Sequence, residues 1–339
     1  YEWPGEYKHR DEKAMQRIKL SYASEMEKIK WMQFMFFRQW KEVKTYCNNR
    51  GIQLIGDLPF YVSYDSVDVW SHRDLFKLDT EGALLAMAGV PPDAFSEDGQ
   101  LWGMPVFNWP VLKEQNFDWW VKRLKKNTEL FDLVRLDHFR AFSAYWEVPA
   151  GETTAKNGSW QKGPGAAFFT VVKKTLKALP FIAEDLGDID PPVYALRDRF
   201  DLPGMNVLQF AFGEDMPASA HTPHNYKQHS VVYTGTHDNN TTVGWYREEK
   251  EKVHEYLEKY TGRKIKDSEA ASLLCRMAYA SVADIAIVPM QDVLGLDERA
   301  RMNIPSSTGN NWRWRLLPQQ ISGEAEKELR QWTKVYNRM

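Results

Sequence analysis

The chain has 339 residues, 43% of them apolar, and a formal net charge of -2. This length allows one large domain or two ordinary ones, and the apolar content argues against disorder. The near-neutral charge gives no electrostatic basis for binding nucleic acid or a membrane, and no apolar run is long enough to span a bilayer. Two distant cysteines, Cys47 and Cys275, are no disulfide framework and favour a reducing compartment. We therefore expect a cytoplasmic protein, or a plastid protein if the source is photosynthetic.

Aromatic residues are unusually frequent, at 14% of the chain. They are consistent with a large aromatic core, and equally with sugar binding, because the C–H faces of a pyranose stack on aromatic rings. Composition alone does not decide between these two interpretations.

The first 50 residues are typical of helix, and Gly51 marks the end of it. The stretch from Trp31 to Trp40 is apolar nearly all round, which predicts that much of this helix is buried. We interpret residues 1–51 as a helical insertion that precedes barrel strand 3.

Short apolar runs then alternate with helical stretches, a pattern that predicts a parallel sheet with crossover helices. The runs lie at residues 52–57, 133–137, 181–185, 206–211, 231–238 and, more weakly, 285–289. The segment 58–130 is too long for one crossover and is interpreted as a helical insertion subdomain.

Polar residues end nearly every run, which favours a (β/α)₈ barrel over an open sheet, because the active site of a barrel is built from all its strand ends. The expected fold is therefore an α/β TIM barrel over residues 52–339 with helical insertions. Only six of the eight strands are found. We accordingly expect a part of a longer protein, with a gap beside the strand at 52–57 and weak activity of this chain alone.

Three acids, Asp137, Glu184 and Asp238, each lie at the end of an apolar strand run. We expect them to converge on one barrel mouth. Like charges raise one another's pKa, as a general acid at neutral pH requires. Retaining exchange of glycosidic bonds uses a nucleophilic carboxylate and an acid/base carboxyl. Any single one of these acids could instead cap the N-terminus of the next helix. That structural role explains the presence of all three acids poorly.

Neighbouring residues add to this hypothesis. Arg135 lies two residues before Asp137, so both side chains point to one side of the strand and the guanidinium keeps the carboxylate ionised. His138 is interpreted as a structural histidine, and His237 as a group that hydrogen-bonds sugar hydroxyls. No metal-ligand pair, cysteine cluster or phosphate-binding glycine loop is found, so no metal or other cofactor is expected.

The sequence resembles glycoside hydrolase family 77, the 4-α-glucanotransferases. The matching segments occur in the family's order and are 56–59, 89–103, 134–140, 182–187, 234–241 and 300–305. The segment 89–103 resembles the long loop over the active site that separates this family from ordinary α-amylases.

The resemblance implies that Asp137 is the nucleophile, Glu184 the acid/base and Asp238 the transition-state stabiliser. It implies further that Arg135 and His237 contact the donor glucose, and that Asp93, Glu97, Trp102 and Asn303 lie along a glucan groove. The implied substrates are maltooligosaccharides and α-1,4-glucans of the starch or glycogen type. A retaining α-amylase-type hydrolase and an inactive glucan-binding fragment remain as alternatives.

Overall fold

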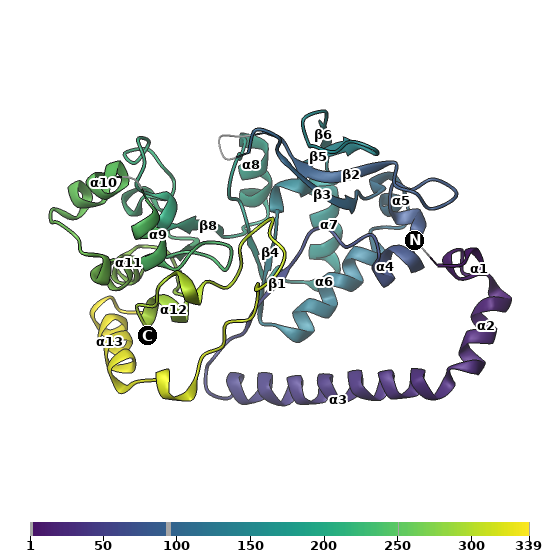
Figure 1. The fold of residues 1–339 in the computed structure, drawn as a ribbon, viewed down its shortest axis with the longest axis horizontal. Helices are drawn as coiled ribbons and strands as arrows, with labels where there is room; N and C mark the ends of the chain where they lie inside the picture. The colour runs from purple at the N-terminus through teal and green to yellow at the C-terminus, as the bar shows by residue number, and fades with distance from the viewer. Residues whose placement is uncertain (1–2, 93–95, 250, 339) are drawn as a thin grey trace. The chain divides into compact units, whose positions relative to one another are not determined.

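The computed structural model describes residues 3–92, 96–249 and 251–338. The chain divides into two compact units, residues 1–202 and residues 203–339. Each unit is described by itself below, and Figure 1 gives the course of the chain through both. No described helix is long and apolar enough to cross a membrane.

The first unit contains a three-stranded parallel sheet in the order β1-β4-β7. Its strands are β1 (Ile55–Leu58), β4 (Leu133–Leu136) and β7 (Phe181–Ala183). Gly56 is required in β1, because a Cβ there would lie 2.2 Å from the ring of Phe131. Among the described residues, β4 is the one strand that pairs with β1 in this sheet, so β1 is an edge strand.

A four-stranded antiparallel sheet in the order β3-β2-β5-β6 also belongs to the first unit. Its strands are β2 (Ala86–Val90), β3 (Gln100–Pro105), β5 (Ala144–Pro149) and β6 (Ser159–Lys162). The segment 58–130 therefore contains helices, as expected, and also two strands that the helical interpretation did not foresee. β2 pairs with β3 inside the segment and with β5 outside it, so the sheet extends beyond residues 58–130.

The helices of the first unit are α1 (Gly5–Lys8), α2 (Glu12–Ser21), α3 (Ala23–Asn48), α4 (Val67–Ser71), α5 (Trp109–Glu114), α6 (Asp118–Leu130), α7 (Gly165–Leu176) and α8 (Pro191–Arg199). The core of this unit is strongly aromatic. Phe60, Phe107, Trp120, Phe142 and Phe168 are all buried and contact one another ring to ring. Many aromatic residues of the chain thus serve packing.

The prediction that the helix at 31–40 is largely buried is wrong. No residue of α3 is classed as buried, and Trp31, Phe34 and Phe36 are each 61% exposed. The helix is fixed near its C-terminal end, where Trp40 donates to the carbonyl of Leu130. Lys126 of α6 lies over the ring of Phe37, but the apolar side chains of the middle turns are largely exposed. An apolar run predicts burial only where a partner surface exists.

The second unit contains a three-stranded parallel sheet in the order β8-β9-β10. Its strands are β8 (Gly204–Val207), β9 (Ser230–Tyr233) and β10 (Ile285–Ile287), and every residue of β8 and β9 is buried. Its helices are α9 (Thr242–Glu248), α10 (Glu251–Thr261), α11 (Asp267–Ala280), α12 (Met290–Val293) and α13 (Gly323–Val335). With these strands, the described part of the chain contains the six predicted parallel strands, although the run at 206–211 is strand only as far as Val207 and continues as a 3₁₀ helix.

Candidate active site

Three carboxylates lie at one edge of the parallel sheet of the first unit. Asp57 lies in β1, Asp137 directly follows β4, and Glu184 directly follows β7. The parallel pairing continues past the strands, because the N–H of Asp137 donates to Leu58 and the N–H of Glu184 donates to Leu136. Adjacent parallel strands thus bring all three acids to the same edge.

Arg135 links two of these acids. Its Nη1 lies 2.8 Å from both carboxylate oxygens of Asp57 and 3.0 Å from Oδ1 of Asp137. Arg135 is 7% exposed. Burial opposes its charge, but the carboxylates of Asp57, Asp137 and Glu184 outweigh that effect and raise the pKa of Arg135. A permanent positive charge therefore lies against Asp137, as the spacing of the two residues predicted.

Glu184 has the properties of a general acid. Burial is the main effect that raises the pKa of Glu184 to about 7. The positive charge of Arg135 lowers this pKa, and the negative charge of Asp137 raises it further. The N–H of Leu186 donates to Oε1 over 2.9 Å, and the N–H of His138 donates to Oε2 over 2.6 Å. The carboxyl group is thus fixed in orientation and half-protonated near neutral pH.

His138 connects the acids to the aromatic core. Its backbone is left-handed, with φ +51°, and its N–H donates to Glu184. Its ring lies among aromatic side chains, 5.1 Å from Trp102 and 6.2 Å from Tyr61 between centroids. Burial, with the nearby charge of Arg140, lowers its pKa to about 3, so the imidazole is neutral. This environment agrees with a structural histidine.

Asp238 lies in the second unit, in the loop that follows β9. Nδ2 of Asn303 donates to its Oδ1 over 2.6 Å, and Nη2 of Arg301 donates to its backbone carbonyl over 2.9 Å. Nε2 of His237 lies 3.4 Å from its Oδ2, and the His237 ring lies 5.1 Å from that of Trp312. Asn303, expected along a glucan groove, is thus in contact with the third acid.

The loop 234–241 is attached to a buried carboxylate beneath it. Asp292, 2% exposed, accepts hydrogen bonds from the hydroxyl of Thr234 and from both the N–H and the hydroxyl of Thr242. Thr234 begins the loop and Thr242 begins α9, so Asp292 holds both of its ends. Burial raises the pKa of Asp292.

The remaining predicted residues lie around the segment 89–103, whose two ends belong to β2 and β3. Trp102 is part of β3, where its indole N–H donates to Gln100 and its ring contacts His138. Glu97 is exposed in the turn between the strands. Asp93 lies outside the described residues.

The structure therefore brings Asp137, Glu184 and Arg135 together. Trp102 lies near them, because its ring contacts the ring of His138, whose N–H donates to Glu184. It separately brings Asp238, His237 and Asn303 together in the second unit. That Asp238 converges on the other two acids remains a prediction. Of the described His, Cys, Asp and Glu residues, no three or more form a group that could hold a metal ion.

Sequence reasoning did not include Asp57 among the site residues. The signal was present, because Asp57 ends a strand run just as Asp137 and Glu184 do. It also belongs to the motif at 56–59. Its contact with Arg135 depends on the pairing of β1 with β4, which the sequence does not specify.

Comparison with known proteins identifies the family of this chain. The 4-alpha-glucanotransferase model of glycoside hydrolase family 77 matches residues 1–320. A 4-alpha-glucanotransferase of Thermus thermophilus is 46% identical over 99% of this chain and 68% of its own length. One from Solanum tuberosum, named chloroplastic/amyloplastic, is 44% identical over all of this chain and 59% of its own length.

Solved structures give the same result. An amylomaltase from Streptococcus agalactiae, in complex with acarbose, superposes with a TM-score of 0.95 at 39% identity, over 99% of this chain and 68% of that one. An amylomaltase from Corynebacterium glutamicum, at 17% identity and a TM-score of 0.73, shares the fold. The fold class is thus the (β/α)₈ barrel with insertions, of which the described residues supply two three-stranded parallel sheets. The chain belongs to glycoside hydrolase family 77, the 4-alpha-glucanotransferases.

Proposed function

We propose that this chain is a 4-α-glucanotransferase that cleaves α-1,4-glucans with retention and transfers the glucanosyl unit to the 4-OH of glucose or another maltooligosaccharide. One observation carries the proposal. A carboxylate beside a buried arginine, Asp137, and a carboxyl with a pKa of about 7, Glu184, follow adjacent strands of one sheet. The names of the relatives and the acarbose bound to one of them support the same class of substrate.

In the first step, a carboxylate oxygen of Asp137 attacks the anomeric carbon of the donor. Glu184 gives its proton to the departing glycosidic oxygen, which leaves as the new 4-OH of the released sugar. A covalent glucosyl ester on Asp137 and an ionised Glu184 result. Arg135 keeps Asp137 ionised beforehand, and so maintains its nucleophilicity.

In the second step, the 4-OH of an acceptor sugar attacks the same carbon. Glu184 takes the proton of this hydroxyl, the ester bond to Asp137 breaks, and both groups return to their starting states. A pKa near the working pH suits Glu184 to both directions of proton transfer.

Residues of both units have further proposed roles. Asp238 stabilises the positive charge that develops on the sugar ring, and Asn303 fixes the orientation of its carboxylate. His237 and Arg135 contact hydroxyls of the donor glucose. Trp102, Glu97 and Asp93 contact the glucan beyond the cleaved bond, and the segment around them excludes water in favour of a sugar acceptor.

The domain division into residues 1–51 and 52–339 also remains a proposal.

Incubation with maltotriose and chromatography of the products test the activity. Transfer gives glucose together with maltodextrins longer than maltotriose. Shorter sugars alone indicate a hydrolase, and binding without turnover indicates an inactive glucan-binding fragment.

We further place the protein in the cytoplasm, where the free thiols of Cys47 and Cys275 remain reduced.

Two substitutions test the roles of the acids. Asp137→Asn should abolish turnover and leave glucan binding largely intact. Glu184→Gln should slow transfer from natural glucans by about a hundredfold or more, but should slow reaction of a glycosyl fluoride far less, because fluoride departs without a proton. Equal losses on both donors contradict the acid role.

Retention also predicts a separation of about 5–5.5 Å between the carboxyl groups of Asp137 and Glu184.

A further inference from the structure

Arg140 is a buried cation that contacts three parts of the first unit. It lies in the 3₁₀ helix η2 (Phe139–Phe142) and is 6% exposed. Its guanidinium carbon lies over the ring of Trp160 in β6, 3.8 Å from the ring centroid. Its Nη1 donates to the backbone carbonyl of Asp188, and its Nη2 lies 3.7 Å from Oδ2 of Asp190. One side chain thus joins η2, the antiparallel sheet and the loop that precedes α8.

The loop 185–190 carries one of the hydrogen bonds that fix the proposed acid/base. The N–H of Leu186 donates to Oε1 of Glu184 over 2.9 Å. The first residue of the loop forms an ion pair with Nη1 of Arg197 in α8. Arg140 contacts the loop beyond Leu186, so the loop is held by one arginine at its start and by another near its end.

The contacts of η2 lie on both sides of Leu186. The N–H of Phe139 donates to the backbone carbonyl of Glu184 over 3.1 Å, and Arg140 contacts the later part of the loop. Asp190 occupies the N-cap position of α8, where a carboxylate commonly accepts a hydrogen bond from the first turn. Its side chain makes no such bond, and its Oδ2 lies near Arg140. The position of Leu186 therefore depends on η2.

Stability alone does not explain why this cation is buried. Burial lowers the pKa of Arg140, and the carboxylates of Asp190 and Asp188 only partly offset that effect. Its Nε is buried and has no hydrogen-bond partner among the described residues. An apolar side chain can often replace a buried charge that is incompletely paired without loss of stability. The two contacts with the loop therefore point to a role in orientation.

We propose that Arg140 is a positioning residue for Glu184, because it holds the loop where the N–H of Leu186 reaches the carboxyl group. The acid/base role of Glu184 is taken from the proposed function. The N–H groups of Leu186 and His138 hold one carboxyl oxygen each. A carboxyl that has lost one of these bonds can rotate away from the glycosidic oxygen, which slows proton transfer. The attack by Asp137 does not depend on this bond.

A test without substrate uses the full chain with ¹³C-labelled glutamate, and the Glu184 resonance is assigned by its loss in Glu184→Gln. The N–H of Leu186 lowers the pKa of Glu184, so the carboxyl should titrate at higher pH in Arg140→Leu. Arg135 and Asp137, the charged groups that act on Glu184, are unchanged in this variant. The amide of Leu186 should exchange with D₂O about tenfold faster or more.

A kinetic test separates proton transfer from nucleophilic attack. In Arg140→Leu, kcat/KM for maltotriose should fall by about tenfold, and kcat/KM for a glycosyl fluoride by less than about twofold, because fluoride departs without a proton. Arg140→Lys keeps the positive charge and one donor nitrogen and should recover part of the loss. A merely structural role would lower kcat/KM for both donors alike.

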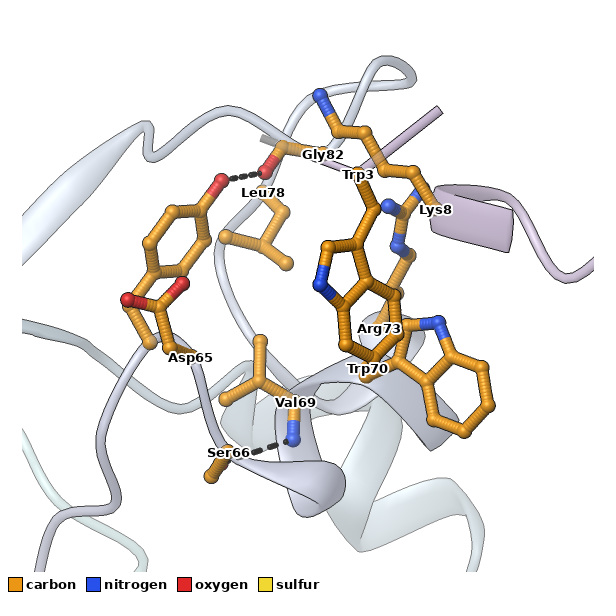
Figure 2. A pocket seen from close by; sticks show the side chains of 10 residues that line it. Trp3, Lys8, Asp65, Ser66, Val69, Trp70, Arg73, Leu78 and Gly82 are labelled. Atoms are coloured by element: carbon orange, nitrogen blue, oxygen red, sulfur yellow. Dashed lines mark hydrogen bonds between the residues drawn. The ribbon is translucent and has the colours of Figure 1, made fainter. Parts of the chain in front are cut away.

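Arg73→Leu is the matched control, because it also removes a cation from the first unit. Figure 2 shows Arg73 near Lys8 and Trp70, where it lines a pocket that includes neither of the two acids. This substitution should leave the titration of Glu184, the exchange of Leu186 and both values of kcat/KM unchanged.

Equal losses of kcat/KM on both donors, or unchanged exchange at Leu186 in Arg140→Leu, overturn the positioning role. A raised pKa of Glu184 with unchanged exchange overturns it too, because Arg140 would then act through its charge alone. If Arg140→Leu does not fold, Arg140→Lys decides by the same measurements, since lysine has one nitrogen in place of the two that contact the loop. Absence of maltotriose turnover in the unsubstituted chain contradicts only the proposed function, because titration and exchange still decide the role of Arg140.

Discussion

The backbone N–H of His138 donates to Oε2 of Glu184 over 2.6 Å, so the residue after the proposed nucleophile holds the proposed acid/base in place. The backbone of His138 is left-handed at this bond, with φ +51°. The two proposed catalytic groups are therefore linked through the backbone at His138. This N–H also lowers the pKa of Glu184 against the larger effect of burial.

Substitution at His138 tests this coupling. Asparagine tolerates left-handed backbone and valine does not, while both lose the imidazole ring. We expect His138→Val to lower kcat about tenfold further than His138→Asn. The alkaline limb of the pH profile should move upward in the valine variant, because the N–H that stabilises ionised Glu184 is displaced. Equal kinetics in the two variants would show that only the ring matters.

The pH dependence of transfer follows from the raised pKa of Glu184, about 7. The protonated form is the acid in the first step, so kcat/KM for a maltooligosaccharide should fall as pH rises through about 7. With a glycosyl fluoride donor the same limb should be absent from kcat/KM, because the leaving group needs no proton. A limb of the same pKa with both donors would assign it to another group.

Asp57 gives a third prediction. It contacts Arg135 through the same Nη1 that touches Asp137, so Asp57→Asn should let the guanidinium move and misplace the nucleophile. We expect kcat/KM to fall by about tenfold to a hundredfold. The loss should be alike for glucan and fluoride donors, in contrast to Glu184→Gln, and Asp57→Glu should restore part of it. A loss confined to glucan donors would place Asp57 in proton transfer.

The sequence predicts those residues of the candidate site that lie at the ends of strands. Asp137, Glu184 and their arginine could be found because each directly follows or lies within an apolar run, and parallel strands end at one edge. Asp292 could not be found in this way. It lies in a short helix after the weakest run and acts through hydrogen bonds to Thr234 and Thr242, at sequence separations of 58 and 50 residues. Such contacts depend on tertiary packing, which no local pattern encodes.

The burial of α3 was mispredicted, and a pair of substitutions measures the consequence. Phe34 is 61% exposed, whereas Phe168 is fully buried and stacks on Phe142 with centroids 4.9 Å apart. We expect Phe168→Ala to lower the free energy of unfolding of this chain by about 3–5 kcal/mol. Phe34→Ala should change it by less than about 0.5 kcal/mol. Urea denaturation measures both, and similar losses would mean that α3 is covered in solution.

Asp292 provides the last prediction. Removal of its carboxylate in Asp292→Ala leaves a buried N–H and two buried hydroxyls without their acceptor, at a cost of about 3 kcal/mol or more in the free energy of unfolding. Asp292→Asn should cost less, because its amide oxygen can still accept from the N–H of Thr242 and the two hydroxyls can turn to accept from its NH₂ group.

Asp284→Ala is the matched control, since the Asp284 side chain is 45% exposed and lies beside His229. It should change the free energy of unfolding by less than about 0.5 kcal/mol. If Asp292 positions the loop that carries His237 and Asp238, the folded Asp292→Asn chain should also lose kcat while its KM for maltotriose changes little. Unchanged kcat in that variant would show that the hydrogen bonds of Asp292 stabilise the second unit without setting the geometry of the loop.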